Sequence, residues 1–434
     1  MTRAATAAMR IEGGLVLPGG GEPPFVGWID IREGRIAAVG RGIAPRDASL
    51  SSLDASGCAV LPGLVNTHAH SHSSLTRGSA EGMRLEAWIA TIEREQTLLT
   101  DSDAYTAALV TYGEALLSGT TTILDMCLRP EAAMRAARDI GMRVVIAPYV
   151  LDERSFAPQL ADVRRLLENR GAAADRVSVW VGLHDLETCS DGTIAAGAAL
   201  AAEFHTGLHL HCAESRVAVE RTRARTGRSP IAQLAVLGAL GKRTVLAHCV
   251  WADVDDRRLL SESATNVAHC PHANLKLASG MAPVPELLAA GVGVALATDG
   301  AKANNRLDMF DVMKFTSLLH KGTHLDAGVL PPSTVVDMAT GAGACALGLE
   351  IGSLAPGALA DLVLVDLQQF HLVPGTPDAI TTNLVHAARG SDVRTVVVGG
   401  EVVVENRRLT RIDTEAALRA MQDASRRLSA LVSP

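Results

Sequence analysis

The sequence predicts an α/β fold in which a parallel (β/α)8 barrel of the TIM type is joined to a small β-sandwich domain built from both chain ends. From residue 64 to residue 299, short β-rich runs alternate with longer Ala-, Leu- and Arg-rich stretches of helical pattern. Strand-like runs broken by glycine and proline precede this region and return after it. The 434 residues, 48% of them hydrophobic, suffice for one large core and a second, smaller one.

Residues 1–61 are predicted to form the N-terminal part of the sandwich. Strand-like runs at 15–17, 25–31 and 35–39 are separated by Gly-rich turns. The triplet Gly19-Gly20-Gly21 indicates a turn and not a phosphate-binding loop, because no lysine and helix follow it.

The barrel is predicted to span residues 62–355. Its eight strand runs are 64–68, 120–125, 143–150, 177–184, 207–211, 244–248, 266–269 and 292–299. Helical stretches between or after them include 103–118, 130–140, 157–168, 193–204, 230–240, 253–262 and 283–290. An open doubly wound sheet is the alternative, but no Gly-x-Gly-x-x-Gly turn follows the first strand, so the barrel is favoured.

Residues 356–434 are predicted to complete the sandwich and to end in a helix. The β-rich runs 360–365 and 394–404 resemble the N-terminal runs, so we expect both sets to share one domain. Alanine, leucine and methionine recur at helical spacing from residue 414 to residue 431. This last helix is expected to pack across a face of the molecule.

The composition excludes several classes of partner. The formal net charge is −7, no polybasic run occurs and aromatic residues make up 3%, so neither nucleic acid nor a membrane surface is expected to bind. No apolar run approaches the ~18–20 residues that span a bilayer, and residues 1–10 do not have the pattern of a signal peptide. Seven scattered cysteines predict reduced thiols and a cytoplasmic protein.

The first barrel strand ends in the stretch LPGLVNTHAH, residues 61–70. Side chains two residues apart on a strand lie on the same face, so His68 and His70 point the same way. In a barrel they project at the carboxyl end, where such folds carry their chemistry. Two imidazoles from one strand form a bidentate site for a divalent metal ion, although a His-x-His pair alone is a weak signal.

Ionisable residues also lie at the ends of four other predicted strands. They are His184 at the fourth strand, His209, His211 and Glu214 at the fifth, His248 at the sixth and Asp299 at the eighth. His68 and His70, together with His211 and Asp299, can surround one metal ion and leave an open position for water. The alternative is that these four residues have a purely structural role. It is disfavoured because all four stand at the ends of predicted strands.

The other histidines are given different roles. His72 lies beyond the strand in a Ser-rich loop and is predicted not to be a ligand. His209 is predicted to be a buried hydrogen-bonding residue one layer below His211. His269 and His272 are expected to support the site from loops, and surface or helix-packing roles are assigned to His205, His320, His324, His371 and His386.

Six segments, in this order, resemble the amidohydrolase superfamily. The similar branch contains cytosine and guanine deaminases, methylthioadenosine/S-adenosylhomocysteine deaminases and triazine hydrolases. The segments are PGLVNTHAH at 62–70, HCAE at 211–214, LAHCV at 246–250, NLKLASG at 274–280, ATDGA at 297–301 and GSLAPGALAD at 352–361. No single segment is decisive, but six in the right order are highly specific.

The resemblance implies that His68, His70, His211 and Asp299 bind one divalent metal ion per chain, zinc in most relatives and iron in some. Bound zinc lowers the pKa of its water to roughly 7 and so supplies hydroxide at neutral pH. The hydroxide can attack an electron-poor ring carbon that carries an exocyclic amine. The expected activity is therefore hydrolytic deamination of an amino-substituted nitrogen heteroaromatic, which is purine-, pterin- or nucleoside-like.

Three residues receive catalytic roles from the resemblance. Glu214 can protonate the ring nitrogen, and Asp299 can take the hydroxide proton and pass it to the departing amine. His248 can orient the hydroxide or stabilise the developing charge.

Gln96 and His184 are expected to bind the substrate. Gln96 stands where the S-adenosylhomocysteine deaminases keep an acidic residue, and Ala303 and Pro148 stand where they keep a serine and an arginine. Gln96 and the segment MKF at 313–315 are similar to the triazine hydrolases. A triazine-type hydrolase that releases chloride or an alkylamine therefore stays open as an alternative.

Two further alternatives are weaker. A cyclic amide hydrolase would normally use a binuclear site with a bridging lysine, but His184 ends the fourth strand. A scaffold protein without activity would not need both Glu214 and His248. The resemblance implies a homo-oligomer, a dimer or a tetramer, and the sequence leaves open whether Asp185, Glu187 and Lys302 contact the substrate.

Overall fold

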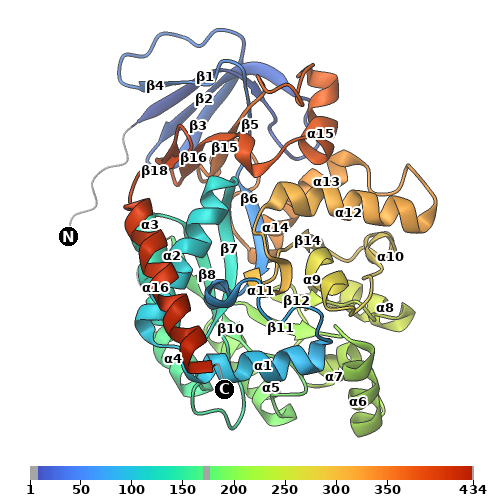
Figure 1. The fold of residues 1–434 in the computed structure, drawn as a ribbon. Helices are drawn as coiled ribbons and strands as arrows, with labels where there is room; N and C mark the ends of the chain where they lie inside the picture. The colour runs from blue at the N-terminus through green and yellow to red at the C-terminus, as the bar shows by residue number, and fades with distance from the viewer. Residues whose placement is uncertain (1–7, 170–175, 433–434) are drawn as a thin grey trace.

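The computed structural model of the protein describes residues 8–169 and 176–432. Parallel strands lie at its centre, helices surround them, and a separate sheet lies at one end (Figure 1). The central strands form two sheets of order β6-β7-β8-β9 and β10-β11-β12-β13-β14. Their bounds are β6 Leu64–Ala69, β7 Thr120–Cys127, β8 Arg143–Pro148, β9 Val177–Val179, β10 Val181–Gly182, β11 Leu208–Cys212, β12 Thr244–His248, β13 Asn266–His269 and β14 Val294–Leu296.

The two central sheets adjoin each other at both edges. β9 and β10 flank Trp180 and are two halves of the predicted fourth strand; the Trp180 amide donates to the Ile146 carbonyl of β8 at 2.8 Å. At the opposite edge, the Asp299 amide donates to the His68 carbonyl at 3.0 Å and so ties the end of β14 to β6. The predicted α/β fold, with its eight successive parallel strands, is confirmed.

Three strands are shorter than predicted, and the third of the barrel ends at Pro148 instead of residue 150. The fourth is interrupted at Trp180, and the eighth ends at Leu296 although the β-rich pattern continues to Asp299. Asp299 has a φ of 60°, which is incompatible with an extended strand. The chain therefore turns at Asp299, the predicted carboxylate ligand of the metal.

Helices cover the outside of the strands. Those that match predicted stretches are α2 Asp101–Leu117, α3 Pro130–Ile140, α4 Leu160–Glu168, α5 Asp191–Glu203, α7 Pro230–Val236, α8 Val254–Glu262 and α10 Val284–Ala289. Others lie in the loops or after β14: η1 Ser71–Thr76, α1 Leu85–Thr97, α6 Arg216–Thr226, α9 Pro271–Lys276, α11 Ala301–Asn304, α12 Met309–His324, α13 Pro332–Met338, α14 Gly341–Leu347, α15 Pro377–His386 and η2 Gly390–Asp392. Within the described ranges, no helix has the length and apolar character needed to cross a bilayer.

Both chain ends contribute to one nine-stranded sheet of order β18-β17-β16-β15-β5-β1-β2-β3, with β4 beside β1. The bounds are β1 Met9–Val16, β2 Phe25–Arg32, β3 Arg35–Arg41, β4 Ser51–Asp54, β5 Cys58–Pro62, β15 Leu362–Asp366, β16 Val393–Val398, β17 Glu401–Glu405 and β18 Arg408–Leu409. The antiparallel pair β5–β15 joins the N-terminal strands to the C-terminal ones, as expected. The domain boundaries near residues 61 and 355 stay a prediction.

The C-terminal helix α16 (Thr414–Val432) packs along α2 and near α1 (Figure 1). Arg427 forms an ion pair with Asp103 of α2, and the Ser425 hydroxyl donates to the Leu75 carbonyl at 2.8 Å. Leu428 is buried in the same core cluster as Leu85 of α1. The predicted tail helix is therefore confirmed, and it supports the loops at the carboxyl ends of the strands.

A buried ion pair links the barrel to the small sheet. Nε and Nη2 of Arg143, on β8, lie 2.8 and 2.9 Å from the two carboxylate oxygens of Asp361, which precedes β15. The Gly399 amide also donates to Asp361, at 2.7 Å. Arg143 is 7% exposed and Asp361 is 1% exposed, so neither charge has water as an alternative partner.

We expect Asp361→Ala to lower the free energy of unfolding by about 3–5 kcal/mol, because Arg143 then stays buried without a counter-charge. Denaturant unfolding followed by circular dichroism measures this loss. The exposed pair Arg419–Glu415 gives the control, since Glu415→Ala is expected to cost only about 0.3–0.5 kcal/mol. A loss below about 1 kcal/mol in Asp361→Ala would contradict the role assigned to the buried pair.

Candidate metal centre and active site

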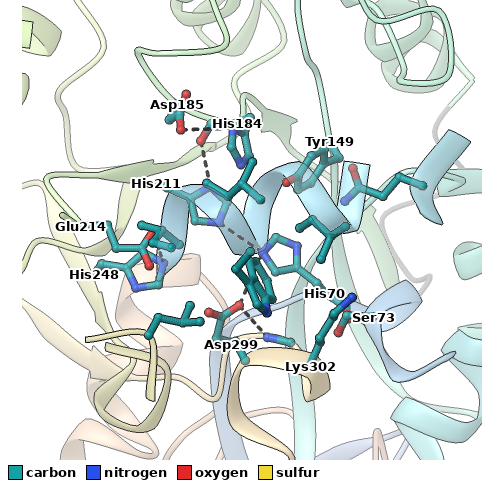
Figure 2. A pocket seen from close by; sticks show the side chains of 18 of the residues that line it. His70, Ser73, Tyr149, His184, Asp185, His211, Glu214, His248, Asp299 and Lys302 are labelled. Atoms are coloured by element: carbon teal, nitrogen blue, oxygen red, sulfur yellow. Dashed lines mark hydrogen bonds and ion pairs between the residues drawn. The ribbon is translucent and has the colours of Figure 1, made fainter. Parts of the chain in front are cut away.

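Three imidazoles and one carboxylate meet at the carboxyl ends of β6, β11 and β14. Figure 2 shows two of these imidazoles, His70 and His211, together with Asp299. Nε2 of His70 lies 3.1 Å from Nε2 of His211. Oδ1 of Asp299 lies 3.5 Å from Nε2 of His68 and 3.5 Å from Nε2 of His70. The nitrogens of the three histidines lie close enough together to hold one metal ion.

Hydrogen bonds on the far side of two rings determine which nitrogen faces the centre. Nδ1 of His70 lies 2.8 Å from the Met126 carbonyl, and Nδ1 of His211 lies 2.8 Å from the His184 carbonyl. A carbonyl oxygen only accepts, so each Nδ1 carries the hydrogen. Each Nε2 therefore presents a lone pair to the centre.

A hydrogen bond to His209 determines which nitrogen of the His68 ring faces the centre. Nδ1 of His209 donates to the Val245 carbonyl at 2.8 Å, so its Nε2 accepts from Nδ1 of His68 at 2.7 Å. Nε2 of His68 is then an unprotonated, fully buried atom with no hydrogen-bond partner. The predicted burial and hydrogen bonding of His209 are confirmed.

Three lone pairs thus converge, and the Nε2 atoms of His70 and His211, which carry two of them, are 3.1 Å apart. Burial lowers the pKa of His68, His70 and His211, so the imidazoles are neutral, as metal binding requires. Converging lone pairs repel one another unless a cation lies between them. The donor set of three imidazoles and a carboxylate therefore fits a divalent metal ion.

The tips of the strands adopt left-handed backbone conformations. The φ angles are 49° at Ala213, 74° at His248 and 60° at Asp299, and such values cost about 1–3 kcal/mol at residues other than glycine. After Asp299 the chain passes close to η1, and a Cβ added to Gly300 would lie 2.4 Å from Oγ of Ser73. Glycine at this position lets Asp299 approach the His70 loop.

Glu214 and His248 lie side by side next to the three imidazoles. Nε2 of His248 lies 3.7 Å from Oε2 of Glu214, and its Nδ1 donates to Oδ1 of Asn274 at 2.8 Å. The ring of His248 stacks on His211 with centroids 5.4 Å apart. Burial raises the pKa of Glu214, so its carboxyl group holds a proton at a higher pH than an exposed glutamate does.

His184 and Gln96 lie on other sides of the same site. The ring of His184 is 4.8 Å from that of His211 and 4.8 Å from that of Tyr149. Nδ1 of His184 lies 3.2 Å from Oδ2 of Asp185; burial alone would lower the pKa of His184, but the carboxylate outweighs it and raises the pKa. Gln96, on α1, is buried and hydrogen-bonds to Tyr149.

Nearly all of the predicted site residues line one cavity that is open to solvent. They are His70, Gln96, His184, His211, Glu214, His248 and Asp299, and Asp185, Glu187 and Lys302 line it too. His68 lies one layer deeper and is fully buried. Tyr149 was not predicted as a site residue, because its only signal was an aromatic side chain near the end of the third predicted strand.

The remaining histidines lie mostly outside this cavity. His72 lines the cavity wall but is not among the three histidines that could share a metal. His269 was predicted to lie in a loop, but it is the last residue of β13, and its ring packs against that of His320 on α12 with centroids 5.5 Å apart. His324 pairs with Glu286 and His371 with Asp392.

We expect His209→Leu to weaken zinc binding about 10- to 100-fold, because His68 then loses the acceptor that fixes its tautomer. Competition with a chromophoric chelator measures the affinity of the purified protein for zinc. His205→Ala is the matched control, since His205 is exposed and lies four residues away on the same segment. Equal affinities in the two variants would contradict the role of His209.

Comparisons with known proteins agree with this geometry. The model of the amidohydrolase family matches residues 59–403. A 5-methylthioadenosine/S-adenosylhomocysteine deaminase of Syntrophobacter fumaroxidans is 38% identical over 411 residues, which cover 92% of this chain and 93% of the relative. A 5'-deoxyadenosine deaminase of Methanosarcina mazei is 35% identical over 412 residues, 94% of each chain.

A solved structure is similar over almost the whole chain. It is an adenosine deaminase from Xanthomonas campestris with bound zinc, with a TM-score of 0.92 and 28% identity, covering 97% of this chain and 98% of that chain. The family model alone covers well over half of the sequence. The chain belongs to the amidohydrolase family.

Proposed function

We propose that the protein is a metal-dependent hydrolytic deaminase that removes the exocyclic amino group of an adenine nucleoside or a similar heteroaromatic amine. One observation carries the proposal: the convergence of three imidazole lone pairs and Asp299 beside a buried carboxyl group, Glu214, with a raised pKa. Relatives at 38% and 35% identity are named as deaminases of such nucleosides.

The metal is proposed to be zinc, held by His68, His70, His211 and Asp299. Imidazole and carboxylate ligands suit zinc, and the similar adenosine deaminase contains it. When bound by these residues, such a cation would lower the pKa of its water to about 7 and so would supply hydroxide at neutral pH. Iron would use the same ligands.

The protein side chains divide the proton transfers between them. Glu214 is proposed to donate its proton to the ring nitrogen next to the carbon under attack, for which its raised pKa is suited. Asp299 takes the proton of the nucleophile and delivers it to the departing amine. His248, whose Nδ1 is held by Asn274, orients the nucleophile or stabilises the charge that develops during its attack.

Two residues are proposed to orient the ring. Gln96 and His184 lie on different sides of the cavity, and each contacts Tyr149. Together they can hold a flat heteroaromatic ring between α1 and the end of the fourth strand. A cytoplasmic location and a dimeric or tetrameric state stay predictions.

A triazine-type hydrolase that releases chloride or an alkylamine is the second candidate. Gln96, which lines the cavity, favours it, because a glutamine here is similar to the triazine hydrolases and stands where the S-adenosylhomocysteine deaminases keep an acidic residue. The same metal centre would serve both reactions. The leaving group therefore distinguishes the two candidates.

We expect the zinc-loaded protein to release ammonia from amino-purine nucleosides in a panel that also contains amino-pterins, amino-pyrimidines and amino- and chloro-triazines. His211→Ala and Glu214→Gln are expected to lower kcat/KM by about 10²-fold or more, since each removes a group on which the reaction depends. Ammonia and chloride are measured for each compound. Chloride release without ammonia would favour the second candidate, and silence from every compound with metal bound would contradict both.

We expect kcat/KM to fall at high pH as Glu214 loses its proton. Burial raises the pKa of Glu214, so the acid form is present below that raised pKa and disappears as the pH rises through it. The pH profile of kcat/KM measures this alkaline limb. The residual activity of Glu214→Gln should lack the limb, and a limb unchanged in the variant would assign it to another group.

A further inference from the structure

Helix α1 presents one mainly apolar face to the cavity. Residues at a spacing of three or four along the helix line the cavity: Leu85, Trp88, Ile89, Ile92 and Gln96. Trp88, Ile89 and Ile92 are only half-buried, whereas Gln96 at the end of this face is buried next to Tyr149. A half-exposed apolar wall beside a polar anchor fits a ligand with a polar ring and an apolar substituent.

Lys302 is the only lysine or arginine among the described residues that line the cavity. Its Nζ lies 2.7 Å from Oε2 of Glu95 on α1 and 6.0 Å from the ring centroid of Trp88. The residue is 1% exposed. The charge of Lys302 is therefore already balanced inside the protein.

The opposite side of the cavity has the same arrangement. Figure 2 shows Lys302 near His70 and Ser73, and His184 with Asp185 on the far side. Nδ1 of His184 lies 3.2 Å from Oδ2 of Asp185, so this side of the cavity presents a carboxylate next to its basic side chain. A ligand carboxylate between these two pairs would meet no unpaired lysine or arginine among the described residues that line the cavity, so its loss of hydration would stay uncompensated.

We infer that the cavity accepts a heteroaromatic amine with an uncharged, apolar substituent and discriminates against one that ends in a carboxylate, and that the Lys302–Glu95 pair sets this specificity. The inference rests on the proposed deaminase function. Among the substrates named for relatives, it favours 5'-deoxyadenosine and methylthioadenosine, whose 5' groups are uncharged. It disfavours S-adenosylhomocysteine, whose substituent ends in an amino acid.

The first test uses two 5'-thioadenosines that differ only in their terminal group, a carboxamide or the carboxylate of the same shape. We expect kcat/KM for the carboxamide to exceed that for the carboxylate by about 30-fold or more, because only the charge differs between them. A ratio within about threefold of one would overturn the inference. This measurement uses the unmodified zinc-loaded protein and does not depend on the folding of a variant.

The second test changes the pair itself. Glu95→Gln removes the counter-charge and leaves Lys302 free to face a ligand carboxylate, so we expect the carboxamide-to-carboxylate ratio to fall about fivefold or more. Glu93→Gln is the matched control, because Glu93 lies on the same helix, pairs with Arg154 and does not line the cavity. A ratio that changes equally in both variants, or in neither, would contradict the role of the pair.

The two proposals fail in different ways. If neither thioadenosine nor any amine of the panel releases ammonia while zinc is bound, the deaminase function fails and the inference fails with it. If both release ammonia at similar kcat/KM, the deaminase function stands and only the specificity assigned to Lys302 and Glu95 is overturned. Circular dichroism and zinc content confirm that each variant is folded and loaded.

Discussion

The structure depends on the hydrogen bonds that orient three histidine rings toward one point. The bonds come from Met126 on β7, from His184 at the end of the fourth strand and from His209 on β11. Each holds a hydrogen on Nδ1 and leaves Nε2 unprotonated. Since the acceptors belong to different strands, the metal centre requires the whole barrel wall to be assembled, and the site cannot form in an isolated βα unit.

The strand tips complete this arrangement at an energetic cost. Ala213, His248 and Asp299 adopt left-handed conformations where their strands end, at or directly before the ionisable groups of the site. The amide of Asp299 also donates to the carbonyl of His68. This hydrogen bond places the Asp299 carboxylate next to the His68 ring. Backbone and side chains thus fix the centre together.

Much of this could be predicted from the sequence, because strand alternation and the position of ionisable residues at strand ends are local signals. All eight barrel strands, and the proximity of His68, His70, His211 and Asp299, followed from such signals. The cavity wall could not be predicted, because the contact of Glu95 with Lys302 joins residues 207 positions apart and depends on how α1 lies over the barrel. Tyr149 and the break at Trp180 likewise depend on neighbours that are distant in sequence.

The antiparallel pair of β5 and β15 has a consequence for synthesis of the chain. Pro62 pairs with Leu362, so β5 is synthesised 300 residues before β15, the strand that pairs with it. At ribosomal rates of about 5–20 residues per second, that interval lasts roughly 15–60 s. During it β5, whose five residues are all buried in the finished protein, is an uncovered apolar sheet edge. The nascent protein is therefore most prone to aggregate while its catalytic barrel is being made, and the last 70 or so residues end that exposure.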